Sequence, residues 1–140
     1  MTKSQLLFDA NIIYTLIREL PQGATEKLTE CSTIYLAYYE LGNALWRECL
    51  LLKRISIDEA KKSLDLMYSL LDRMHIASID NQTGSEVLQR AYEFHLTFYD
   101  ATYLIEAKKS GKTLVTDDNK LAKAAENLGI KVLSSNSLMQ

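Results

Sequence analysis

Short runs with high β-propensity alternate with longer helical segments along this chain, and this alternation restricts its fold more than any other feature. The segments between the runs carry apolar residues at helical spacing. The runs are rich in apolar and β-branched residues and occupy residues 6–8, 33–37, 76–79, 113–116 and 131–133. Parallel strands need a crossover connection, which is usually a helix. The alternation therefore predicts an α/β fold, a three-layer α/β/α sandwich around a parallel sheet of about five strands.

Local signals mark where several of the helices begin. Ser56 and Glu59 have the spacing of a capping box, and Thr83 and Glu86 repeat it. Each pair precedes a run with apolar residues at helical spacing. Two long helices, predicted at residues 38–54 and 56–74, should form a hairpin inserted between two strands.

The bulk properties are those of one folded domain that covers residues 1–140. Hydrophobic residues make up 47% and charged residues 24%, which is usual for a globular protein. No apolar run approaches the roughly 18 residues that a membrane span requires, and the N-terminus lacks the pattern of a signal peptide. We therefore expect a cytoplasmic protein with no membrane contact. The net charge of −2 argues against a broad basic surface for nucleic acid.

The cysteines and histidines do not form a metal-binding pattern. Cys31 and Cys49 are far apart, and no histidine near them completes a zinc set. His75 and His95 are also isolated. We expect free thiols and ordinary packing or surface histidines.

Acidic residues follow three of the predicted strands or begin the helices beside them. Asp9 ends the first strand, Glu40 follows the second, and Asp117 and Asp118 directly follow the fourth. Asp100 begins the helix that leads into the fourth strand. Ligands of open α/β sheets bind outside the carboxyl ends of the strands, where the strand order reverses. If the first strand is central, these acids converge there.

A cluster of carboxylates indicates a site for a hard divalent metal, because Mg²⁺ and Mn²⁺ prefer oxygen ligands. Without a cation the acids would raise the pKa values of one another. Each acid also has a purely structural interpretation. Asp9 and Asp100 could cap helices, Glu40 could lie on a solvated face, and Asp117 and Asp118 could favour a helix dipole. The functional interpretation rests on their joint placement.

Four ordered motifs resemble those of PIN-domain nucleases, and the resemblance extends over nearly the whole chain. They are Phe8-Asp9-Ala10-Asn11, Glu40-Leu41-Gly42-Asn43, Tyr99-Asp100-Ala101-Thr102-Tyr103, and Val115-Thr116-Asp117-Asp118. The resemblance implies a sheet with strand order 3-2-1-4-5 and a Mg²⁺- or Mn²⁺-dependent phosphodiesterase acting on RNA.

The resemblance also assigns roles to residues. Asp9, Glu40, Asp100 and Asp118 match the four catalytic, metal-binding acids of the family. Supporting polar positions are matched by Asn11 and Thr116, with Asp117 beside the fourth acid. The doubled acid leaves two candidates for that position, and Asp118 is chosen because the family's acid lies two residues after the threonine.

A compact chain of this kind most resembles the toxin of a VapBC toxin–antitoxin pair. Such toxins form homodimers and are inhibited by a small antitoxin protein. Contacts with phosphate groups could come from Arg18, Arg47, Lys120 or Lys123, although each could simply be a solvated surface residue.

Other functions remain open at this stage. A PIN nuclease could process ribosomal RNA, or a PIN-fold module could bind without catalysis. A signalling receiver domain also carries acids at strand ends. It would need paired acids after the first strand, where Asp9 is instead followed by Ala10 and Asn11, and a phospho-acceptor after the third, where Asp80 fits poorly.

Overall fold

The computed structural model describes residues 2–139, with side chains through residue 138. Its strands are very short. They are β1 (Leu6–Phe8), β2 (Ser32–Ile34), β3 (His75–Ala77), β4 (Thr113–Val115) and β5 (Val132–Leu133). The residues of the three central strands, β1, β2 and β4, are all buried. The helical elements are η1 (Lys3–Gln5), α1 (Ala10–Glu19), α2 (Ala24–Leu28), α3 (Leu36–Trp46), η2 (Arg47–Leu51), α4 (Ile57–Leu71), α5 (Gly84–Phe94), α6 (Phe98–Ser110), α7 (Asn119–Asn127) and α8 (Ser135–Met139).

The five strands form one parallel sheet in the order β3-β2-β1-β4-β5, which confirms the predicted topology. The central strand is β1, where Leu7 pairs with Ser32 of β2 on one side and Leu114 of β4 on the other. The strand order therefore reverses at β1. The end of β1, which leads into Asp9, lies at the position where α/β sheets bind ligands.

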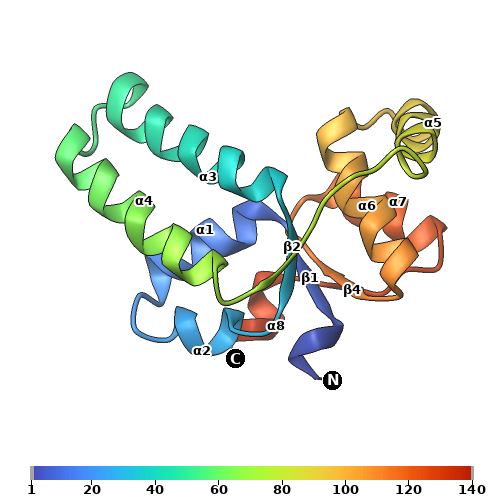
Figure 1. Cartoon of the computed structure of the whole chain (residues 1–140), viewed down its shortest axis with the longest axis horizontal. Helices are drawn as coiled ribbons and strands as arrows, with labels where there is room; N and C mark the ends of the chain where they lie inside the picture. Colours follow the sequence, from blue (N-terminus) through green and yellow to red (C-terminus); the bar gives the residue numbers. More distant parts are fainter. Residues whose placement is uncertain (1, 140) are drawn as a thin grey trace.

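Helices cover both faces of the sheet, as the three-layer prediction required (Figure 1). On one face, Leu6 and Phe8 of β1 pack with α1, α3 and α4. On the other face, Leu7 packs with α5, α6 and α7. Because successive side chains of a strand point to opposite faces, three buried residues of β1 join two separate cores.

The predicted helical hairpin is present, and one of its boundaries was predicted correctly. Ser56 accepts a hydrogen bond from the Glu59 backbone N–H at 3.1 Å, and Glu59 Oε1 accepts one from the Ser56 N–H at 3.2 Å, which completes the capping box of α4. The predicted single helix at 38–54 was wrong in detail. The α-helix begins at Leu36, ends at Trp46 and continues as the π-helix η2.

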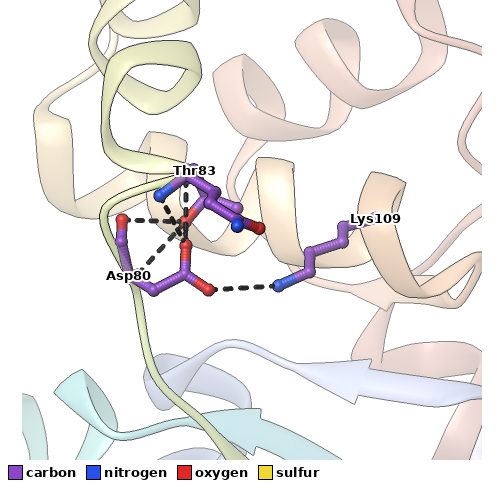
Figure 2. Close-up of polar contacts among 4 residues, drawn as sticks. Asp80, Thr83 and Lys109 are labelled. Carbon is purple, nitrogen blue, oxygen red and sulfur yellow. Dashed lines mark hydrogen bonds and ion pairs between the residues drawn. The ribbon is translucent and has the colours of Figure 1, made fainter.

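Two other local predictions were also wrong. The predicted strand at 33–37 ends at Ile34, because α3 begins at Leu36. The predicted capping box at Thr83 is absent: the carboxylate of Asp80 accepts hydrogen bonds from the backbone N–H of Gln82 and of Thr83, both at 3.0 Å. Figure 2 shows this turn, with Lys109 approaching the other carboxylate oxygen at 3.7 Å. The hydrogen bonds that Asp80 accepts hold the turn that precedes α5. The hydrogen bonds from Thr83 also lower the pKa of Asp80.

Candidate active site

Asp9 is the most enclosed of the predicted acids, with 6% of its surface exposed. It is the N-cap of α1, where its Oδ1 accepts a hydrogen bond from the Ile12 N–H at 2.9 Å. Its Oδ2 accepts a hydrogen bond from the hydroxyl of Thr116, which follows β4. The capping interpretation is therefore correct, but it accounts for only one of the two carboxylate oxygens.

Thr116 connects two of the predicted acids. While its hydroxyl donates to Asp9, the same oxygen accepts a hydrogen bond from the Asp118 N–H at 3.1 Å. Thr116 is buried, so this arrangement is shielded from competing water. These contacts fix the loop after β4 against the end of β1.

The environment of Asp9 disfavours its charge. The pKa of Asp9 is raised to about 6, chiefly by burial; the hydrogen bonds from Thr116 and Ile12 oppose this shift, and the negative charges of Glu40 and Asp117 add to it. Desolvation penalises the ionised form of a carboxyl group. Asp9 is therefore a carboxylate that a nearby cation would stabilise.

Glu40 lies on α3, after β2, and is held by a residue that the sequence analysis did not identify. Its Oε1 accepts a hydrogen bond at 2.7 Å from the hydroxyl of Tyr103, a fully buried side chain of α6. Burial raises the pKa of Glu40, and the charge of Asp100 adds to that effect. Burial and the adjacent Glu40 also raise the pKa of Tyr103, so its hydroxyl keeps the proton that it donates. Tyr103 follows Asp100 by one helical turn, and that spacing was the available signal.

Asp100 occupies the first turn of α6 but does not cap it. The N-cap is Thr97, whose hydroxyl accepts a hydrogen bond from the Asp100 N–H at 3.0 Å. The helix-capping alternative for the Asp100 side chain was therefore wrong. Burial raises the pKa of Asp100, and the charge of Asp118 contributes to the same shift. This carboxylate thus has another acid as a neighbour.

The two acids after β4 have different surroundings. Asp118 is the N-cap of α7, where its Oδ1 accepts hydrogen bonds from the N–H groups of Lys120 and Leu121 at 2.9 and 3.0 Å. Asp117 turns toward the C-terminal segment, where it accepts hydrogen bonds from the Ser135 N–H at 2.8 Å and the Ser135 hydroxyl at 2.6 Å. Both oxygens of Asp117 are thus occupied at the start of α8.

This difference gives a test of the choice between the two acids. Asp117→Ala should remove two hydrogen bonds to a charged acceptor and lower the free energy of unfolding by about 1–2 kcal/mol. If Asp118 is the acid of the site, Asp118→Ala should lower the RNA cleavage that the PIN-domain resemblance implies far more than Asp117→Ala does. Urea denaturation and RNA cleavage of both variants would measure the two effects. A greater loss of activity in Asp117→Ala, at equal folded fraction, would reverse the assignment.

The four acids form a succession of neighbours at the carboxyl edge of the sheet. Glu40 raises the pKa of Asp9, Asp100 raises that of Glu40, and Asp118 raises that of Asp100. Across residues 2–139, none of these four acids forms an ion pair with Lys, Arg or His. Within the same range, no three Asp, Glu, His or Cys side chains are close enough together to hold a metal ion as they stand. The donor chemistry nevertheless fits a hard cation, because the acids offer carboxylate oxygens outside any ion pair among the described residues. One of them has a basic residue nearby, since the charge of Lys120 lowers the pKa of Asp100.

A cavity of about 570 Å³ opens beside Glu40. Asn11, which has an exposed side chain, lines it from α1, and Arg47 lines it from the start of η2. Of the four basic residues proposed to contact phosphate, Arg47 is the one that lines this cavity. Arg18 instead donates a hydrogen bond to the hydroxyl of Tyr14 at 2.8 Å. The π-helix at Arg47 is notable because such turns occur frequently at functional sites.

Among the described residues, no helix is both long and apolar enough to span a bilayer.

Comparison with known proteins identifies the family. The sequence of the chain matches the family model of the PIN domain over residues 6–127. Two proteins of Pyrobaculum aerophilum are similar in sequence. Exonuclease VapC9 is 34% identical over 117 residues, covering 84% of this chain and 83% of the relative. Ribonuclease VapC3 is 32% identical over 129 residues, covering 84% of this chain and 92% of the relative.

Solved structures agree with this result. The crystal structure of PAE2754 from Pyrobaculum aerophilum superposes with a TM-score of 0.74 at 30% identity, covering 96% of this chain and 93% of that one. VapBC2 from Rickettsia felis, solved with a DNA fragment from its promoter, gives a TM-score of 0.63 at 15% identity, covering 92% and 97% of the two chains, and supports the fold alone. The match of the family model over most of the sequence, together with relatives above 30% identity, shows that this chain belongs to the PIN-domain family.

Proposed function

We propose that this protein is a Mg²⁺- or Mn²⁺-dependent endoribonuclease that hydrolyses phosphodiester bonds of RNA. The observation that carries the proposal is the succession of four acids from separate elements, in which Glu40 raises the pKa of Asp9, Asp100 raises that of Glu40, and Asp118 raises that of Asp100. Acids gathered in this way, outside any ion pair among the described residues, weaken the fold unless a cation binds between them. The names of the relatives, Exonuclease VapC9 and Ribonuclease VapC3, support a nuclease.

In the proposed mechanism, Asp9, Glu40 and Asp100 hold the metal and Asp118 completes the site. A divalent cation held by these acids would supply activation of a water molecule and stabilisation of the negative charge on the scissile phosphate. In the overall hydrolysis, the water oxygen bonds to phosphorus, the bond from phosphorus to a ribose oxygen breaks, and a proton lost by the water ends on that ribose oxygen. Thr116 orients Asp9 and Tyr103 orients Glu40, and both act through hydrogen bonds to the ligands. Asn11 lines the cavity and is placed to position the RNA or water.

We further propose that the enzyme acts as the toxin of a toxin–antitoxin pair, as a homodimer in the cytoplasm. The VapC names of the two relatives support an antitoxin partner. If the proposal is right, a small protein encoded next to this chain will co-purify with it and inhibit RNA cleavage. A chain that acts on precursor ribosomal RNA and has no such neighbour would be a processing nuclease instead.

The nuclease proposal predicts that both linear and covalently closed circular single-stranded RNA are cut in the presence of Mn²⁺ or Mg²⁺. A circle has no end, so only an endonuclease can open it. Gel electrophoresis of end-labelled and circular substrates would distinguish the two modes, and a chelator serves as the control. Degradation of the linear RNA alone would show an exonuclease, cleavage that persists with the chelator would exclude metal dependence, and no cleavage of either would favour a non-catalytic module.

A further inference from the structure

Two exposed tyrosines stand immediately before two acids of the candidate site. Tyr39 precedes Glu40 on α3, and Tyr99 precedes Asp100 on α6. Their surfaces are 66% and 60% exposed. Rings that accessible add little to the hydrophobic core, so they are available to bind a partner.

The same two tyrosines connect the acidic site with an apolar cavity. Both line the 570 Å³ cavity that contains Glu40. Both also line a second cavity of about 290 Å³, whose other walls include Ile34, Phe98 and the exposed ring of Tyr35. The two cavities share Leu36 as well, so they adjoin one another along these three side chains, and we refer to them together as the groove. Charged and amide side chains line only the end that contains Glu40, and the other end is mainly apolar.

The chemistry of the groove matches an unpaired nucleotide chain. The end that contains Glu40 offers the guanidinium of Arg47 for a phosphate and the amides of Asn11 and Asn43 for polar groups. The tyrosine rings offer flat apolar faces, on which any base can stack. A duplex keeps its base faces covered by neighbouring bases, so only single-stranded nucleotides can use such a platform.

We propose that Tyr39 and Tyr99 form a stacking subsite for unpaired bases beside Glu40, and that these two rings determine how tightly single-stranded RNA binds. The inference rests on the proposed ribonuclease function and adds two residues that recognise the substrate. Tyr35 supports the platform, because its ring packs against that of Tyr39 with a centroid distance of 6.0 Å and a tilt of 57°.

Binding measured without turnover tests this subsite. The protein carries Asp9→Asn so that the RNA stays intact, and the probe is a short single-stranded RNA with a fluorescent adenine analogue that stacking quenches. We expect quenching on binding, and affinity for the matching duplex at least about tenfold lower. Tyr39→Leu and Tyr99→Leu should each weaken single-strand binding by about fivefold or more and reduce the quenching. Tyr39→Phe and Tyr99→Phe should retain both, because phenylalanine still stacks.

Tyr92→Leu is the matched control, because Tyr92 is 81% exposed on α5 and lines neither cavity. Affinity and quenching that match the Asp9→Asn parent in both leucine variants would overturn the proposal. A groove that then binds a co-purified protein through these tyrosines would be a protein-docking surface. RNA cleavage is measured in parallel with proteins that retain Asp9, so that failure of this proposal can be distinguished from failure of the nuclease function. If RNA is cleaved and the leucine substitutions have no effect on binding, only the stacking subsite is wrong.

Discussion

Asp9→Asn should lower the rate of metal-dependent RNA cleavage by at least about 100-fold. Mutation of a residue that only hydrogen-bonds to a metal ligand typically lowers metal affinity or activity by roughly 10- to 100-fold, and loss of a ligand's charge should have a larger effect. Asp9 is the most buried of the four acids and lies at the end of the central strand. Asparagine keeps an oxygen that can accept the Ile12 N–H, so the start of α1 should be preserved. Initial rates on a labelled single-stranded RNA with Mn²⁺ would measure the effect.

The control for this substitution is Asp65→Asn, which removes one negative charge from the surface of α4. Its rate should stay within about twofold of the parent, because a solvated charge on that helix interacts weakly with the site. Circular dichroism would verify that both variants are folded. If Asp9→Asn cleaves RNA as fast as Asp65→Asn, Asp9 is a helix cap and the proposed metal site is wrong.

The sheet was predictable because its central strands are short and fully enclosed. Leu6, Leu7 and Phe8 form a continuous apolar run that two helical layers cover, and such runs are typical of parallel sheets. The alternation of strands and helices predicted the layers. The strand order came from the resemblance to the PIN domain, since local sequence patterns do not determine which strands are neighbours.

Local patterns failed where one run of residues suits two structures. Residues 33–37 are largely apolar, and such runs do not distinguish a strand from a buried helix segment. In the structure the strand ends at Ile34, and Ala37 is buried in α3 instead. Thr83 was predicted as a capping residue from its spacing to Glu86, but Asp80, three residues earlier, takes the backbone donors instead.

The acids of the candidate site and the supporting Thr116 were proposed from the sequence, but the hydrogen bonds that join such residues could not be. The hydrogen bond between Tyr103 and Glu40 joins positions 63 residues apart, and that between Thr116 and Asp9 joins positions 107 residues apart. No periodicity within a helix or strand encodes such contacts, which depend on how the helices pack on the sheet. The groove beside Tyr39 and Tyr99 was missed for the same reason, because an exposed aromatic residue looks like a core residue until its neighbours are placed.

The charge of Asp9 should also destabilise the metal-free protein at neutral pH. Its pKa is raised from 3.8 in the unfolded chain to about 6 in the folded one. Between these values the folded state holds more protons than the unfolded state, so the free energy of unfolding falls as the pH rises from about 4 to 6. Above pH 6 the loss in the free energy of unfolding is complete and no longer changes with pH. It amounts to about 3 kcal/mol, because a tenfold change in a proton-binding constant corresponds to about 1.4 kcal/mol.

Asp9→Asn removes this cost, so in the presence of a chelator at pH 7.5 the variant should melt at a higher temperature than the parent, by up to roughly 10 °C for a chain of this size. At pH 4 the parent carries a protonated Asp9 and the difference should largely vanish. Excess Mn²⁺ should stabilise the parent at pH 7.5: at a concentration of 100 times Kd, the free energy of unfolding should rise by about 2.7 kcal/mol, and the Tm should rise with it. The variant should respond much less. Calorimetry at the two pH values, with Asp65→Asn as control, tests all three effects. Equal melting temperatures of parent and variant at pH 7.5 without metal would show that Asp9 carries no strained charge, and the electrostatic argument for a cation at this site would then fail.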